Sequence, residues 1–126
     1  MGFRIAPGLP VLLPVQVHGP MEVRRVWGML DTGASVMTIP PQDAAILGYD
    51  VDAAPTVSIV TAGGAAAASR IVLRRVVVAG YRVENVPALC VELSMTRASA
   101  LLGLSLLSRL DFSFDHKAGR LTITDP

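Results

Sequence analysis

The fold of this chain is decided by the stretch Met29-Leu30-Asp31-Thr32-Gly33-Ala34-Ser35. An Asp-Thr-Gly sequence often forms an ordinary turn, in which the Asp side chain accepts backbone hydrogen bonds and the Gly takes a positive φ. Here, however, apolar residues precede the acid, and the strand-like run 36–39 follows the loop. A carboxylate between two buried strands is costly unless hydrogen bonds compensate for its burial or a functional site uses it. Asp31 is therefore a candidate functional residue, with a purely structural turn as the alternative.

Short apolar runs, separated by Gly and Pro, extend on both sides of this stretch. Apolar and polar residues alternate in several of these runs, which is typical of strands with one solvated face. The expected strands cover 13–17, 22–30, 36–39, 56–60, 69–79, 81–86, 88–93, 112–115 and 121–124. Pro87 is expected to break a strand, and Ala65–Ala68 to lie at a hairpin tip. With short helices expected at 42–47 and directly after Gly103, the pattern predicts a mostly β barrel or sandwich.

The composition limits the classes of protein to which the chain can belong. Its 126 residues suit a single domain over 1–126, in which we expect 1–10 to be irregular. Hydrophobic residues make up 52% and charged residues 17% of the chain, which excludes disorder as its main state. The formal net charge of +1 gives no indication of a nucleic-acid partner or of binding to an anionic membrane surface.

The sequence indicates no metal or cofactor site and offers weak support for other nucleophiles. Cys90 is the only cysteine, which excludes an intrachain disulfide and a Cys-rich zinc site. The histidines, His18 and His116, are too few and too far apart in sequence for a His-based metal motif. A thiol protease pair of Cys90 and His116 lacks a family signature, and 103–107 lacks the second Gly of a nucleophile elbow.

No segment predicts insertion into a membrane. The most apolar run, 98–107, is far shorter than the roughly 20 residues of a spanning helix. The N-terminus carries one positive side chain and its apolar stretch is broken by prolines, so it is a poor signal peptide. We therefore expect a cytoplasmic protein, or a periplasmic one if an anchor is missing from this chain.

Two motifs in order resemble those of a known family. Residues 29–34 match the pattern hydrophobic-hydrophobic-Asp-Thr/Ser-Gly-Ala/Ser, and some seventy residues later Leu101-Leu102-Gly103 leads into a short helix. From about Leu13 onward the chain resembles the retropepsin-like aspartic proteases, a single-domain class that includes retroviral proteases, and within it a bacterial subgroup of clan AA. The resemblance implies a single-lobe closed β-barrel with a flap hairpin and one or two short helices.

The resemblance also implies roles for individual residues of the first motif. Asp31 would be the catalytic acid, and Thr32 would bond across a dimer to hold both loops. Gly33 would let the backbone approach the carboxylates. Ala34 matches the retroviral pattern, whereas a Ser at that position would bond the outer carboxylate oxygen.

Two further segments receive roles from the same resemblance. A flap that closes over the substrate would have its tip at Thr61, Ala62, Gly63 and Gly64. The glycines also fit a plain hairpin turn. Leu101, Leu102 and Gly103 would pack behind the catalytic loop, so they support the fold rather than the chemistry.

The chain holds only half of such an active site. These enzymes need two carboxylates that share one proton around a water, one acting as base and the other as acid. The sequence has one Asp-Thr-Gly, and its other aspartates, at 43, 50, 52, 111, 115 and 125, have no Thr-Gly after them. We therefore expect a homodimeric aspartic endopeptidase acting on peptides or proteins. The alternatives are a non-catalytic domain of the same fold that binds peptides or dimerises, and an unrelated β-barrel interaction module.

Overall fold

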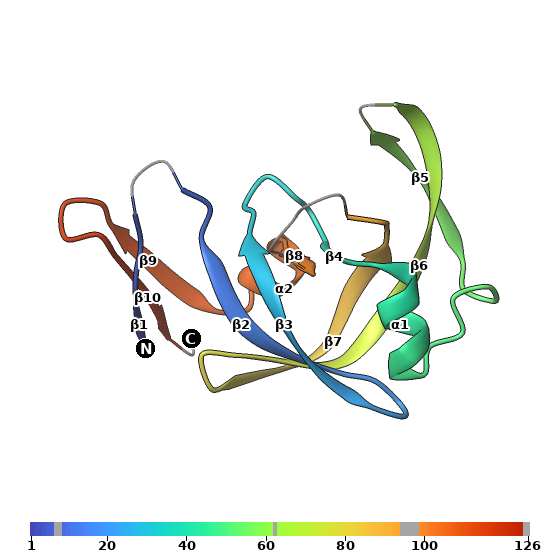
Figure 1. The fold of residues 1–126 in the computed structure, drawn as a ribbon, viewed down its shortest axis with the longest axis horizontal. Coiled ribbons are helices and arrows are strands. Elements are labelled where there is room, and N and C mark those ends of the chain that lie inside the picture. The colour runs from blue at the N-terminus through green and yellow to red at the C-terminus, as the bar shows by residue number, and fades with distance from the viewer. Residues whose placement is uncertain (7–8, 62, 94–98, 125–126) are drawn as a thin grey trace.

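The computed structural model describes residues 1–6, 9–61, 63–93 and 99–124, and strands dominate it (Figure 1). The strands are β1 (Gly2–Arg4), β2 (Leu12–His18), β3 (Val23–Leu30), β4 (Met37–Ile39), β5 (Thr56–Thr61), β6 (Gly64–Val78), β7 (Tyr81–Cys90), β8 (Ala100–Leu102), β9 (Asp111–Asp115) and β10 (Arg120–Thr124). The helices are α1 (Pro41–Leu47) and α2 (Leu104–Leu107). Neither helix of this described part is long and apolar enough to cross a membrane.

Within the described residues, six strands close into a barrel. Their order is β2-β3-β8-β4-β7-β6, and β2 pairs with β6 to close the ring, with Val15 opposite Val78. The pairs β3–β8 and β4–β7 are parallel, whereas β2–β3 and β6–β7 are antiparallel. The expected fold, a mostly β closed barrel with two short helices, is confirmed.

Alternating side chains fill the interior of the barrel. On β2, Leu13, Val15 and Val17 are buried while Pro14 between them is exposed. On β6, Leu73, Val76 and Val78 are buried, so the alternation changes phase between Leu73 and Val76, while the register with β7 stays constant. Each fully buried aliphatic side chain contributes roughly 1.5–3 kcal/mol relative to exposure. The core therefore provides a rigid support for the loops at the barrel ends.

One hairpin extends away from the barrel. β5 pairs only with the first part of β6, from Thr56 opposite Ser69 to Thr61 opposite Gly64, and Figure 1 shows this hairpin projecting from the barrel. The prediction that Ala65–Ala68 form the tip is wrong, because these alanines lie within β6 and pair with β5. Cross-strand pairing to a β-branched strand outweighs the weak strand propensity of alanine.

The predicted break at Pro87 is also wrong, since β7 runs unbroken from Tyr81 to Cys90. The Val91 N–H donates to the Ile39 carbonyl, so the backbone N–H and C=O of Val91 point toward β4. In a strand, residues an even number apart point their backbone groups to the same side, so the N and C=O of Pro87 point toward β4 as well. β4 pairs with β7 only from Met37, opposite Ala88. Pro87 therefore lies just beyond the end of the β4–β7 ladder, where a missing N–H costs no ladder bond.

The expectation of an irregular segment at 1–10 is wrong over Gly2–Arg4. This segment forms β1 and pairs with β10, which also pairs with β9 in a second sheet. The Met1 amino group donates to the Ile123 carbonyl over 2.7 Å, and the Ile123 N–H donates to the Met1 carbonyl over 2.9 Å. A three-residue strand whose partner lies at the other end of the chain leaves no local signal in the sequence.

Candidate active site

Asp31 follows directly after the end of β3 and is held there by the neighbouring segments. The Leu30 N–H donates to the Val11 carbonyl over 2.9 Å, and the Asp31 N–H donates to the Leu102 carbonyl over 3.1 Å. The Asp31 side chain is half-buried, and its Oδ1 accepts the Gly33 N–H over 2.9 Å. The expected turn is therefore present, and it orients the Asp31 carboxylate from within its own loop.

The remaining residues of the loop present little side chain to the carboxylate. Thr32 and Gly33 are exposed, and Ala34 is half-buried. A Cβ built on Gly33 would lie 3.2 Å from Asp31 Oδ1, so a side chain there would crowd the carboxylate. The Ala34 N–H donates to the Asp31 main-chain carbonyl over 3.3 Å, which closes the turn.

The second motif lies directly against this loop. Leu101 and Leu102 belong to β8 and pair with β3, with Leu102 opposite Leu30. Gly103 is buried against the loop backbone, because a Cβ there would lie 2.4 Å from the Val36 carbonyl oxygen. Any side chain at position 103 would therefore displace the loop.

The first two N–H groups of helix α2 donate hydrogen bonds to the loop that carries Asp31. The Leu104 N–H donates to the Ala34 carbonyl over 2.8 Å, and the Ser105 N–H donates to the Ser35 carbonyl over 3.0 Å. The Ser105 hydroxyl also lies 2.8 Å from both the Met37 nitrogen and the Pro87 carbonyl oxygen. Sequence reasoning did not assign Ser105 a role at the site, and a serine in the first turn after Gly103 was the only signal for one.

Of the predicted flap tip, the structure describes Thr61, Gly63 and Gly64, which lie on the projecting hairpin. Gly63 and Gly64 are exposed, and Gly64 has a φ of +110°, which favours glycine. Thr61 ends β5, and Ala62 lies outside the described residues. The neighbouring Val60 side chain is 91% exposed. In Figure 1 the hairpin and the loop after β3 both rise above the same rim of the barrel.

The other described aspartates lie on other elements. Asp43 is in α1, where it forms an ion pair with Arg24 over 3.5 Å. Asp50 and Asp52 follow α1, and Asp111 and Asp115 are in β9. Within the described part of the chain, Asp31 is thus the only aspartate on the loop between β3 and β4.

The structure separates the two residues of the alternative thiol pair. Cys90 is buried in β7 of the barrel, and its burial raises the pKa of the thiol, which disfavours a thiolate nucleophile. His116 is exposed beyond β9 in the second sheet and stacks on Phe114, with ring centroids 6.0 Å apart. No cluster of three or more His, Cys, Asp or Glu side chains suited to a metal ion occurs among the described residues.

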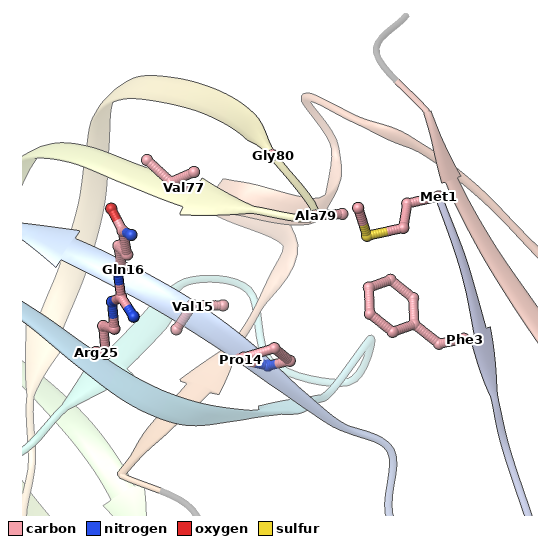
Figure 2. A pocket seen from close by; sticks show the side chains of 9 residues that line it. All are labelled: Met1, Phe3, Pro14, Val15, Gln16, Arg25, Val77, Ala79 and Gly80. Atoms are coloured by element: carbon pink, nitrogen blue, oxygen red, sulfur yellow. The ribbon is translucent and has the colours of Figure 1, made fainter.

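A cavity of about 330 Å³ lies between β1 and the barrel, away from Asp31. Figure 2 shows Met1 and Phe3 on its β1 side, with Gln16 and Arg25 toward the other end. Its lining includes no residue of the loop 31–36 or of the hairpin tip 61–64. The cavity is therefore separate from the candidate active site.

Comparisons with known proteins are consistent with this geometry. A family model described as aspartyl protease matches residues 13–106, which include both motifs and the hairpin. The structure is similar to the crystal structure of a retropepsin-like aspartic protease from Rickettsia conorii, with 26% sequence identity and a TM-score of 0.75. That match covers 99% of this chain and 89% of the other. A search of curated proteins found no match.

Proposed function

Because the chain belongs to the aspartyl protease family, we propose that it is an aspartic endopeptidase, which hydrolyses peptide bonds. In this proposal the active form is a homodimer, and the substrate binds between the Asp31 carboxylates of its two copies. The observation that carries this proposal is the position of Asp31. It is a half-buried carboxylate on a loop fixed by β8 and α2, with Gly33 keeping space open beside it. A well-fixed carboxylate that is still accessible suits acid–base chemistry on a bound water.

The proposed reaction uses one proton shared by the two carboxylates. The ionised Asp31 takes a proton from a water, whose oxygen bonds to the carbonyl carbon of the substrate. The protonated Asp31 of the second copy gives its proton to the carbonyl oxygen, which forms a tetrahedral diol. The first Asp31, now protonated, then gives its proton to the peptide nitrogen, and the C–N bond breaks. As it breaks, a diol hydroxyl returns its proton to the other Asp31, so the products are a carboxylic acid and an amine and the pair again holds one proton. The pair needs one proton in total, so we expect a bell-shaped dependence of activity on pH in the acidic range.

The dimer is proposed because each chain contributes one suitable carboxylate. The loop bearing Asp31 exposes Thr32 and Gly33, so a twofold axis beside the loop would bring two copies together. In this arrangement Thr32 would bond to the opposite loop, and the small Gly33 and Ala34 would leave room for both backbones. The assembly would require an interface of roughly 1,000 Å² or more.

The hairpin is proposed as a flap that closes over the substrate. Thr61, Ala62, Gly63 and Gly64 would form its tip and offer backbone groups to an extended peptide. The support for this role is the projection of the hairpin on the same side of the barrel as the Asp31 loop (Figure 1). The exposed alanines near its tip add little side-chain contact that would hold the tip in place.

The central experiment compares wild type with Asp31→Asn on a peptide library, with and without pepstatin, from about pH 3 to pH 8. We expect Asp31→Asn to lose at least about 10³-fold in cleavage rate because both copies lose their ionisable group. Asp52→Asn, at an exposed aspartate in the turn between α1 and β5, is the matched control and should cleave normally. Full activity in Asp31→Asn would refute the mechanism. A wild type that binds peptides without cleaving them would favour the peptide-binding alternative.

The oligomeric state has a separate test. Sedimentation over a concentration series should show a reversible dimer, and specific activity should fall on dilution as the dimer dissociates. A strict monomer that keeps its full specific activity on dilution would refute the shared site.

A further inference from the structure

Ser105 joins three segments of the chain through one hydroxyl. It lies in the first turn of α2, and its Oγ is 2.8 Å from the Met37 nitrogen at the start of β4. The same Oγ donates to the Pro87 carbonyl of β7 over 2.8 Å. A backbone N–H can only donate and a carbonyl can only accept, so the Ser105 hydroxyl accepts from the Met37 N–H of β4 and donates to the Pro87 carbonyl of β7.

The hydroxyl bonds to both strands at the first pair of the β4–β7 ladder. In a parallel pair, the N–H of Met37 opposite Ala88 would normally donate to the residue before Ala88, which is Pro87. The Ser105 hydroxyl bonds to each of these two groups. A side chain from α2 therefore ties β4 to β7 at the first pair of their ladder.

The same residue also holds the loop that carries Asp31. The Ser105 N–H donates to the Ser35 carbonyl over 3.0 Å, two residues before the Met37 N–H that its hydroxyl accepts. Together with the Leu104 N–H on the Ala34 carbonyl, these bonds fix the chain from Ala34 to Met37. At its other end, Asp31 is fixed by the Leu102 carbonyl. The loop is thus held at both ends by residues 102–105.

We propose that Ser105 is a positioning residue for the reaction, which fixes the segment Ala34–Met37 and thereby the direction of the Asp31 carboxylate. This inference rests on the proposed protease function. Ser105 acts through the backbone and not on the substrate, so its loss should lower kcat and leave KM nearly unchanged. A misplacement of about 1 Å at a reacting group costs roughly 10²-fold in rate.

The activity test uses three substitutions at one position and a matched control. Ser105→Ala should lower kcat by about 10²-fold. Ser105→Thr, which keeps the hydroxyl, should recover most of that loss. Ser108→Ala removes an exposed serine hydroxyl at the end of the same helix and should leave kcat unchanged. A wild-type kcat in folded Ser105→Ala, or an equal loss in Ser105→Thr and Ser105→Ala, would overturn the proposal.

If Ser105→Ala does not fold, Ser105→Cys replaces it, since a thiol is a weak donor. A wild-type kcat in Ser105→Cys would then overturn the proposal.

Amide hydrogen exchange supplies a readout that does not depend on activity. In Ser105→Ala, exchange should accelerate at Met37 and also at Ala34, whereas Ser108→Ala should match wild type. Faster exchange at Met37 alone would overturn the proposal, because the hydroxyl would then order β4 without ordering the loop. If the wild type cleaves no peptide, the proposed function fails, and the exchange rates at Ala34 still decide whether Ser105 holds the loop.

Discussion

The loop after β3 and the hairpin of β5 and β6 rise from the same barrel, but they are held in different ways. The loop exchanges hydrogen bonds with β8 and α2, and Gly103 packs against its backbone. The outer hairpin consists of two strands that pair with each other, and its Val60 and Ala65–Ala67 side chains are exposed. Where the proposed chemistry needs fixed geometry, contacts converge from distant segments. Where the proposed flap would admit a peptide, the two strands pair mainly with each other.

Where the hairpin meets the barrel, hydrogen bonds join it to neighbouring segments of the chain. The Ser69 hydroxyl donates to the Val51 carbonyl over 3.0 Å, and the Arg70 N–H donates to the Pro55 carbonyl over 2.7 Å. Slightly further along β6, the Arg74 N–H donates to the Tyr49 hydroxyl, which itself donates to the His18 carbonyl. Local opening should therefore involve 56–68 and stop near Ser69.

The strongest test of this contrast is Gly103→Ala. The added Cβ would lie 2.4 Å from the Val36 carbonyl oxygen and 2.8 Å from the Ala34 carbonyl oxygen, so backbone must move. We expect a loss of about 3 kcal/mol or more in the free energy of unfolding, together with loss of cleavage. Urea denaturation and a peptide assay would measure both. Wild-type values in the two assays would show that the junction tolerates displacement, contrary to the comparison.

The corresponding change in the hairpin is Gly64→Ala, which should cost less. A Cβ on Gly64 meets nothing within 4 Å, so the cost comes only from its φ of +110°. Left-handed strain of this kind amounts to about 1–2 kcal/mol, and opening of the hairpin can relieve part of it. The same urea denaturation applies. A loss as large as that of Gly103→Ala would mean that the hairpin is as rigidly held as the loop.

Hydrogen exchange should separate the two regions directly. In the free protein, amides in 63–67 should exchange faster than those in β2, and a peptide-like inhibitor should slow them by about tenfold, equivalent to about 1.4 kcal/mol. The β2 amides serve as the internal control and should not respond. High protection at 63–67 in the free protein, unchanged by the inhibitor, would contradict the flap assignment.

The smallest expected effect comes from Tyr49→Phe, at the base of the hairpin. Loss of the two hydroxyl bonds should cost about 1 kcal/mol in the free energy of unfolding. Burial raises the pKa of Tyr49, so the folded state favours the neutral phenol. Its contribution is therefore complete below the ordinary tyrosine pKa of about 10 and is lost as pH rises through the raised pKa.

This pH dependence provides the measurement. Urea denaturation at about pH 8 and about pH 11 should show a smaller alkaline loss of stability in Tyr49→Phe than in wild type. Tyr81→Phe, at another half-buried tyrosine, is the matched control and should keep the wild-type loss. An equal alkaline loss in wild type and Tyr49→Phe would show that Tyr49 does not contribute.

The sequence predicted the parts of the fold that have local signals. Alternation along 13–17 and the Gly after α1 located elements correctly, and Leu102 and Gly103 lie behind the Asp31 loop as the resemblance implied. β1, the continuity of β7 through Pro87 and the strand character of Ala65–Ala68 were missed. Each of these depends on a partner strand, because pairing overrides the preference of the residue alone.

Of the candidate site, the sequence singled out Asp31 but not Ser105. Asp31 stands out in the sequence because an acid between apolar runs is unusual, and its catalytic role stays a prediction. Ser105 does not stand out, since a serine in a leucine-rich segment looks like an ordinary polar position. Its proposed role becomes visible only when its hydroxyl is seen to bond to both β4 and β7.

The bond between Ser105 and Met37 at the start of β4 joins residues 68 positions apart in the chain, and this separation has a consequence for the order of folding. Closing a loop of this length has a large entropic cost that must be met before the contact stabilises anything. During synthesis, Asp31 leaves the ribosome long before residues 102–105 that hold its loop. We infer that the carboxylate gains its final geometry only after residues 102–105 have been made. A protein that cleaves peptides would thereby stay harmless to its own nascent chain and to its neighbours until the barrel has closed.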